Sequence, residues 1–265
     1  MEIGDKGAVI VGGASGMARA AATALHARGA NIAIVDLPTS AGAEVAEELK
    51  GTFHPCNVMD EAQVESALSD AIGALGNVWI GINTAGGGIA KRTLTKEGPH
   101  PLEDFRRIIE LNLISTFNVT RLLADAMSKN EPNEDEERGV IIQTASIAAF
   151  EGQIGQVAYA AAKAGIAGMT LVMARDLGSL GIRVNTVAPS LFATGLTKGI
   201  PDEFANVLTK DAAFPKRMGK PEEYAKLAVA IVENPMLNGS CIRLDAGQRF
   251  APKCHEKSPV GRSSG

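Results

Sequence analysis

Aromatic residues, histidine and cysteine are scarce in this chain of 265 residues. Each scarcity limits how the core can be packed or which kinds of metal or disulfide site the chain can form. Aromatics make up 4% of the sequence, so a packed interior must be built mainly from Ala, Val, Ile and Leu. The three cysteines include no Cys-x-x-Cys pair and the four histidines are scattered, so no spacing is typical of a metal site. We predict no bound metal and expect free cysteine thiols in a reducing compartment.

Long apolar runs and a strong charge are also lacking. No apolar run reaches the ~18 residues that predict a membrane-spanning helix. The net charge is −4 and the basic residues form no stripe, which gives nucleic-acid binding little electrostatic support. A strand-like run follows the first few residues directly and leaves no room for a targeting peptide. We therefore expect a cytoplasmic protein that binds neither membranes nor nucleic acid.

Short β-branched runs alternate with longer alanine-rich segments along most of the chain. Strands are predicted at 8–11, 31–36, 52–56, 78–83, 139–146, 182–187 and 240–245, and helices at 16–28, 41–50, 60–74, 102–127, 155–177 and 221–233. Repeated strand–helix–strand units predict a parallel sheet with helices on both faces. The fold class is α/β, a single-domain, Rossmann-like doubly wound parallel sheet over residues 1–250.

Three segments fall outside this alternation. The acidic run at 130–139 is interpreted as a solvated loop, with a partner-binding surface as the alternative. Residues 190–220 are irregular and follow the sixth strand, at the edge where such sheets bind ligands, so we interpret them as a substrate loop. The polar stretch 251–265 is rich in Ser and Gly and is predicted to be a disordered tail.

A glycine-rich turn, VGGASGMA, joins the first strand to the first helix. In this setting the pyrophosphate of a dinucleotide meets a helix N-terminus, although a turn that merely needs glycine is the alternative. Asp36 ends the second strand, where a carboxylate hydrogen-bonds an adenine ribose 2′-hydroxyl and repels a 2′-phosphate. Because no Arg or Lys follows it directly, the sequence favours NAD over NADP. The predicted cofactor-binding residues at this turn and at the neighbouring strand ends are Gly12, Ser15, Gly16, Met17, Asp36, Asn57, Val58, Asn83, Ala85 and Gly86.

Tyr159 and Lys163 lie four residues apart in a predicted helix, so their side chains share one helix face. A nearby cation favours a phenolate, and we expect Lys163 to bring the pKa of Tyr159 towards working pH. Ser146 ends the fifth strand at the carboxyl edge of the sheet, and Asn112 lies within the preceding long helix. Each of these residues alone has an ordinary structural alternative, but together with the glycine turn they predict a catalytic set.

The chain resembles the short-chain dehydrogenase/reductase family in the glycine turn, NTAG at 83–86, Asn112, Ser146 and the Tyr159-x-x-x-Lys163 pair. Longer stretches at 100–123, 138–163, 174–196 and 233–247 resemble the branch of that family that acts on 3-hydroxyacyl-CoA. The resemblance implies NAD-dependent interconversion of a secondary alcohol and a ketone. It makes Tyr159 the general acid/base and Ser146 the group that orients the substrate oxygen. Lys163 would lower the pKa of Tyr159 and bind the nicotinamide ribose, and Asn112 would hold a helix distortion and a water. The family resemblance adds Tyr159, Lys163, Pro189 and Phe192 to the predicted cofactor-binding residues.

The resemblance also implies a homotetramer that packs through the long helices containing Asn112 and Tyr159. Relatives of this branch also work in mitochondria, so a mitochondrial location is the alternative to the cytoplasmic one. Alternative substrates are a hydroxysteroid or another bulky alcohol, and the ketoacyl group of fatty-acid synthesis, which relatives reduce with NADPH. A protein of another class, a nucleotide-binding scaffold subunit with incidental activity, is a further alternative. One sequence does not decide the substrate, because the loop at 190–220 shapes its site.

Overall fold

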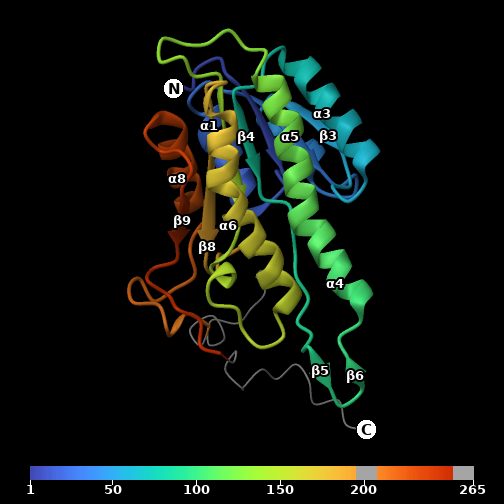
Figure 1. The fold of residues 1–265 in the computed structure, drawn as a ribbon. Helices are drawn as coiled ribbons and strands as arrows, with labels where there is room; N and C mark the ends of the chain where they lie inside the picture. The colour runs from blue at the N-terminus through green and yellow to red at the C-terminus, as the bar shows by residue number, and fades with distance from the viewer. Residues whose placement is uncertain (195–207, 253–265) are drawn as a thin grey trace.

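The computed structural model describes residues 1–194 and 208–252, and seven of the strands in these ranges form one parallel sheet (Figure 1). The order across the sheet is β3-β2-β1-β4-β7-β8-β9. The chain runs outward from β1 to β3 and then from β4 to β9, so the winding reverses between β1 and β4. The predicted doubly wound α/β class is confirmed, with element boundaries that differ by a few residues. The strands are β1 (Gly7–Val11), β2 (Asn31–Asp36), β3 (Thr52–Pro55), β4 (Ile80–Asn83), β7 (Gly139–Thr144), β8 (Ile182–Pro189) and β9 (Cys241–Leu244).

Helices cover both faces of this sheet. The apolar sides of α1, α2 and α8 join one core cluster, and those of α3, α5 and α6 join the other. The predicted helix over 102–127 is interrupted by a π-helical turn, η1 (Glu110–Ile114), which places Asn112 at a distortion. The helices are α1 (Gly16–His26), α2 (Gly42–Glu48), α3 (Glu61–Leu75), α4 (Leu102–Ile109), α5 (Ser115–Met127), α6 (Val157–Gly178) and α8 (Pro221–Glu233).

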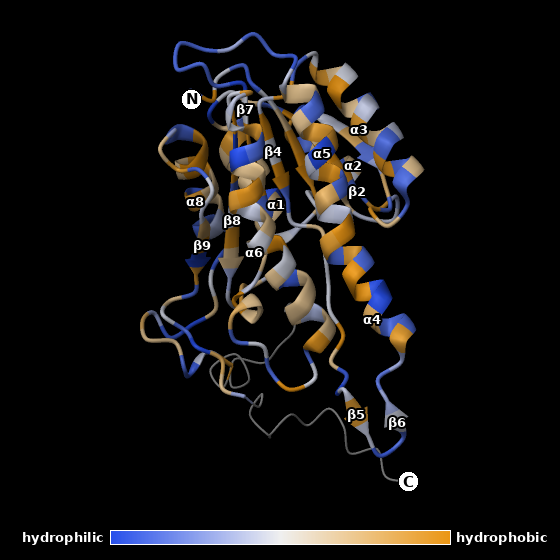
Figure 2. Ribbon diagram, viewed as in Figure 1, coloured by the Kyte–Doolittle hydropathy of each residue, from blue (hydrophilic) through white to orange (hydrophobic). Residues whose placement is uncertain are grey.

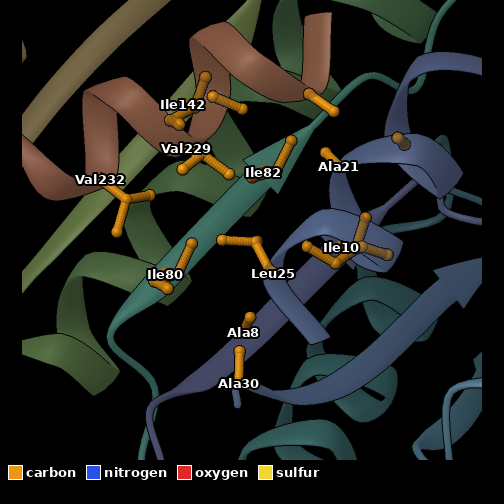
Figure 3. Packing of buried hydrophobic residues seen from close by; sticks show 14 of the residues in the cluster. Ala8, Ile10, Ala21, Leu25, Ala30, Ile80, Ile82, Ile142, Val229 and Val232 are labelled. Carbon is orange, nitrogen blue, oxygen red and sulfur yellow. The ribbon is translucent and has the colours of Figure 1, made fainter. Parts of the chain in front are cut away.

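Alanine and branched aliphatic residues fill the core between the sheet and the α1/α8 layer (Figure 3). Ala21 and Leu25 of α1 and Val229 and Val232 of α8 are all at most 4% exposed, and Ile82 of β4 lies beneath them. Small alanine side chains let the two helices lie close to the sheet and to each other. Full burial of one Leu or Val side chain stabilises the fold by about 1.5–3 kcal/mol.

A two-stranded antiparallel hairpin, β5 (Leu94–Thr95) with β6 (Gly98–Pro99), projects beyond the carboxyl edge of the sheet (Figure 1). It was not predicted, because strands of two residues carry no alternating pattern. The hairpin lies in the connection from β4 to α4. Lys91 at its base forms an ion pair with Asp104 of α4.

The acidic loop between α5 and β7 is hydrophilic along most of its length (Figure 2), but its interpretation as wholly solvated is wrong. Glu137 is 5% exposed, and its Oε1 accepts a hydrogen bond of 2.8 Å from Nε of Arg183, which is 6% exposed. Arg183 also donates to the main-chain carbonyls of Ile231, Val232 and Leu237 at 2.7–3.0 Å. A buried charge needs an opposite charge or several hydrogen bonds, and this pair has both.

Helix α6 is the one helix among the described residues that is long and apolar enough to cross a membrane by length and composition alone. Lys163, Arg175 and Asp176 interrupt its apolar sequence, so the prediction that no apolar run reaches about 18 residues still holds. In the fold, however, α6 packs along β8, and two of its residues contribute to the cavity described below.

The first two residues of the predicted tail, 251 and 252, are hydrogen-bonded to the rest of the fold. The carbonyl of Ala251 accepts a hydrogen bond of 3.2 Å from Gln153, and that of Pro252 accepts one of 2.9 Å from the amide of Ile154. The chain is therefore bound to the loop before α6 as far as residue 252. Residues 253–265 of the predicted tail and 195–207 of the predicted substrate loop lie outside the described residues.

Candidate active site

Two adjoining cavities lie at the carboxyl edge of the sheet, where the winding reverses. One, of about 540 Å³, is bordered by the glycine turn and the ends of β2 and β4. The other, of about 400 Å³, is bordered by the end of β7, the start of α6 and the end of β8. Met17, Thr84, Gly86 and Thr194 line both, so the cavities meet. A larger cavity of about 740 Å³ between α1 and α8 contains none of the predicted catalytic side chains.

The structure brings most of the predicted site residues to these two cavities. The first is lined by Gly12, Ser15, Gly16, Met17, Asp36, Asn57, Val58, Ala85 and Gly86, and the second by Ser146, Tyr159, Lys163, Pro189 and Phe192. Asn83 and Asn112 are the exceptions, because both are buried behind the walls. Oδ1 of Asn83 accepts a hydrogen bond of 3.0 Å from the amide of Ala85, so this side chain shapes the wall.

The glycine turn is built for close approach of a ligand. Gly12 has φ +79°, and a Cβ atom there would lie 2.8 Å from Oγ1 of Thr84, so a larger residue would be both strained and crowded. Ser15 precedes the first turn of α1 and makes no side-chain capping hydrogen bond. The first amides of α1 therefore remain available to an anion such as a pyrophosphate.

Asp36 is fixed by main-chain amides at the end of β2. Its Oδ2 accepts a hydrogen bond of 2.9 Å from the amide of Ala14, and its Oδ1 accepts one of 2.7 Å from the amide of Leu37. The first of these bonds links the carboxylate to the glycine turn. A negative charge thus lines the first cavity, where it can accept hydrogen bonds from a diol and disfavours a phosphate.

Ser146 and Tyr159 form the reactive end of the second cavity. Ser146 is the N-cap of the short helix η2 (Ile147–Ala149), and its Oγ accepts a hydrogen bond of 3.1 Å from the amide of Ala148. Burial raises the pKa of Tyr159 above its ordinary value, and a hydrogen bond with Ser146 opposes this rise. The expectation that the pKa of Tyr159 is lowered is therefore not met in this structure, because desolvation of the phenol outweighs its favourable contact.

Lys163 is buried beneath Tyr159. Its Nζ lies 5.6 Å from the centroid of the Tyr159 ring and donates a hydrogen bond of 2.9 Å to the carbonyl oxygen of Thr144. The side chain is 4% exposed, and burial lowers its pKa to about 8. A lysine with this pKa can gain and lose a proton near neutral pH, as a proton relay requires.

Asn112 holds the loop that follows β4. Its Nδ2 donates to the carbonyls of Gly87 and Ile108 at 2.8 and 2.9 Å, and its Oδ1 accepts from the amide of Gly87 at 3.1 Å. The distortion expected around this residue is confirmed by the π-helical turn. The bonds to Gly87 connect this distortion to the wall of the second cavity.

Several cavity residues were not among the predicted site residues. Thr84 lines both cavities, and its place in NTAG was a usable signal. Gln156 lines the second cavity three residues before Tyr159, so helical spacing could have identified it. Leu191 lines it from the loop after β8, where the sequence has no regular pattern.

Comparisons with known proteins agree with this geometry. Residues 6–204 match the model of the family described as short chain dehydrogenase. The chain is 50% identical to human 3-hydroxyacyl-CoA dehydrogenase type-2 over 249 residues, which cover 92% of this chain and 95% of the relative. The Drosophila melanogaster protein of the same name is 48% identical over 248 residues, which cover 92% and 97%.

Solved structures show the same fold. A crystal structure of 3-hydroxyacyl-CoA dehydrogenase type-2 from Mycobacterium avium has 40% identity and a TM-score of 0.90, covering 96% of this chain and 100% of that one. A 7α-hydroxysteroid dehydrogenase complexed with NADH and 7-oxo glycochenodeoxycholic acid has 29% identity and a TM-score of 0.84, covering 95% and 97%.

Proposed function

The chain belongs to the short-chain dehydrogenase family, and from this premise we propose that it interconverts 3-hydroxyacyl-CoA and 3-ketoacyl-CoA with NAD. The observation that supports this proposal most strongly is that Ser146, Tyr159 and Lys163 line one cavity, which adjoins the cavity beside the glycine turn and Asp36. A nicotinamide cofactor bound there supplies or accepts the hydride. Relatives named for 3-hydroxyacyl-CoA are 48–50% identical to this chain, whereas two ketoacyl-carrier-protein reductases are 30–31% identical.

Each catalytic side chain has a role that its position supports. The hydroxyl groups of Ser146 and Tyr159, which line the same cavity, would both contact the substrate oxygen. Tyr159 would give a proton to the ketone oxygen in reduction and take one from the alcohol in oxidation. Ser146 would hold that oxygen and stabilise its developing negative charge. Lys163, with its pKa near 8, would then exchange a proton with Tyr159.

Acetoacetyl-CoA with NADH tests the proposed substrate, with loss of NADH absorbance as the readout. Acetoacetyl-pantetheine, which lacks the nucleotide part of CoA, and an oxosteroid serve as comparison substrates. We expect kcat/KM to be highest for the CoA thioester. Efficient turnover of the steroid with none of either thioester would contradict the proposal and favour a hydroxysteroid dehydrogenase, which the 7α-hydroxysteroid dehydrogenase fold supports as the second candidate.

We propose NAD rather than NADP because the carboxylate of Asp36 is fixed at the first cavity. A phosphate at about 5 Å would be repelled by roughly 3 kcal/mol per unit charge at an effective dielectric constant of 20. Asp36→Asn keeps the shape and removes this charge, so we expect kcat/KM for NADPH to rise at least about tenfold. Equal use of NADH and NADPH by the wild type would contradict this choice.

We also propose a homotetramer. Exposed apolar side chains support it, since Phe117 of α5 and Leu171 and Val172 of α6 are 47–56% exposed. Large apolar side chains that gather on exposed helices are typical of surfaces that pack against another subunit. Light scattering of the purified protein tests the stoichiometry, and a monomer at micromolar concentration would contradict it.

A further inference from the structure

The acceptor that holds the ammonium of Lys163 belongs to the main chain of β7. Pairing between β4 and β7 ends at Asn83 and Gln143, so Thr144 lies one residue beyond the last pair on that side, while on its other side it still pairs with Val187 of β8. Its carbonyl oxygen accepts the hydrogen bond of 2.9 Å from Nζ of Lys163. The position of this ammonium group therefore depends on where the end of β7 is held.

The side chain of Thr144 is held by the helix layer on the other face of the sheet. Its Oγ1 lies 2.9 Å from the hydroxyl oxygen of Tyr224, near the start of α8, and the two hydroxyls share a hydrogen bond. Tyr224 is fully buried at 0% exposure, and burial raises its pKa to about 12, so the phenol stays neutral at working pH. The aromatic ring belongs to the α1/α8 core cluster, and a phenylalanine at this position keeps that ring.

Tyr224 lines neither cavity of the active site, yet only two hydrogen bonds and one residue separate its hydroxyl from Nζ of Lys163. A buried hydroxyl that loses its partner costs free energy, so each of the two hydroxyls restrains the other. Among the described residues, Tyr159 is the titratable side chain beside Nζ of Lys163. Tyr159 belongs to α6, which covers the face of the sheet opposite to α8.

We propose that Tyr224 is a positioning residue for the reaction: its hydrogen bond to Thr144 fixes the carbonyl oxygen that receives the ammonium group of Lys163. This inference rests on the proposed proton exchange between Lys163 and Tyr159. It assigns a role in proton handling to α8, a helix that contributes no side chain to the reacting atoms. The ring of Tyr224 packs in the core between α1, α8 and the sheet, and its hydroxyl group holds Thr144 next to the active site.

Tyr224→Phe removes the hydroxyl and retains the ring, so it is the primary test. We expect kcat for reduction of acetoacetyl-CoA to fall about tenfold, which corresponds to roughly one hydrogen bond, while KM changes less than about twofold. A less firmly held carbonyl of Thr144 stabilises the charged form of Lys163 less, which lowers the pKa of Lys163. The decline of kcat at alkaline pH should therefore begin at a lower pH. A full wild-type kcat and an unmoved limb would overturn the proposal.

Variants at Thr144, which itself lines the second cavity, provide a further test should Tyr224→Phe fail to fold, and the double variant separates an effect on the cavity wall from the loss of the bond. Thr144→Val should reproduce the loss, and Thr144→Ser, which keeps the hydroxyl, should restore kcat to within about twofold of wild type. The double variant Tyr224→Phe, Thr144→Val should be no slower than the slower single variant, because both changes break one bond. Additive losses would overturn the proposal.

Thr170→Val is the matched control. Thr170 of α6 shares a buried hydroxyl–hydroxyl bond of 2.7 Å with Thr186, whose hydroxyl also donates to Oε1 of Gln143 at 3.2 Å. Neither threonine side chain is hydrogen-bonded to Thr144 or Lys163. We expect it to lower stability without moving the alkaline limb. An equal shift of the limb in this control would show that any loss of a buried hydroxyl bond suffices, and would overturn the specific role of Tyr224.

A direct titration separates this proposal from the proposed function. Selectively ¹³C-labelled lysine, with the Lys163 signal assigned by its absence in Lys163→Met, reports the pKa of Lys163 without any substrate. We expect a pKa near 8 in wild type and a lower one in Tyr224→Phe. If the pKa of Lys163 falls in Tyr224→Phe but the wild type does not turn over acyl-CoA, the proposed substrate is refuted and the role of Tyr224 stands. If the pKa of Lys163 is the same in both proteins, the role of Tyr224 is refuted.

Discussion

Replacing Glu137 by Ala should destabilise the fold strongly, although Glu137 belongs to an acidic loop whose sequence predicts exposure to solvent. The substitution removes the carboxylate 2.8 Å from Nε of Arg183 and leaves a guanidinium group that is 6% exposed without a counter-charge. The carbonyls around Arg183 still accept hydrogen bonds, but they do not neutralise it. Breaking one partner of such a buried pair costs about 3–5 kcal/mol.

Thermal and urea denaturation measure this loss. For domains slightly smaller than this one, each kcal/mol lowers Tm by roughly 2–4 °C, so we expect a decrease of about 6–20 °C. Glu137→Gln keeps an acceptor and should cost less than Glu137→Ala. Below the transition, kcat should stay near wild type, because Glu137 lines neither active-site cavity.

Glu134→Ala is the control from the same loop. Glu134 is exposed, and its loss should change the free energy of unfolding by less than about 0.5 kcal/mol. Glu137→Ala and Glu134→Ala with the same small effect would refute the reasoning, because the pair with Arg183 would then contribute no more than a surface charge.

Three further results are expected. Gly86→Ala should reduce kcat at least about hundredfold, because a Cβ atom there would lie 2.5 Å from Oδ1 of Asn112 and 3.3 Å from Nζ of Lys163; wild-type kinetics would contradict this crowding. Ketone reduction should decline as pH rises through about 8, since the lowered pKa of Lys163 means that the relay loses its proton there, and a flat rate from pH 7 to 9 would exclude Lys163 as the relay. Gly12→Val should weaken NADH binding measured by fluorescence, and unchanged affinity would show that the turn does not form the cofactor site.

The alternation of apolar strands and alanine-rich helices was enough to predict the sheet and its doubly wound class. Local pattern determines such elements, and α8 was predicted with its observed bounds, Pro221–Glu233. The hairpin of β5 and β6 was missed because two-residue strands leave no periodic signal. The π-helical turn at Asn112 came only from family resemblance, since its sequence reads as ordinary helix.

The residues of the candidate site could be predicted from the sequence, but the direction in which burial shifts their pKa values could not. Motif spacing identified Ser146, Tyr159 and Lys163, and the fold brings them to one cavity. Spacing alone does not report burial, so it gave the wrong direction for the pKa of Tyr159. It also missed Glu137, whose partner Arg183 is distant in sequence. The cytoplasmic location stays a prediction.

The central claim is that the phenol of Tyr159 handles the substrate proton while a nicotinamide bound beside it handles the hydride. Single-turnover reduction of acetoacetyl-CoA by Tyr159→Phe, preloaded with NADH, tests this claim most directly. We predict NADH affinity within about twofold of wild type and a hydride-transfer rate lower by about 10²–10⁴-fold, the usual contribution of a general acid. Hydride transfer at the wild-type rate in this variant would contradict the account.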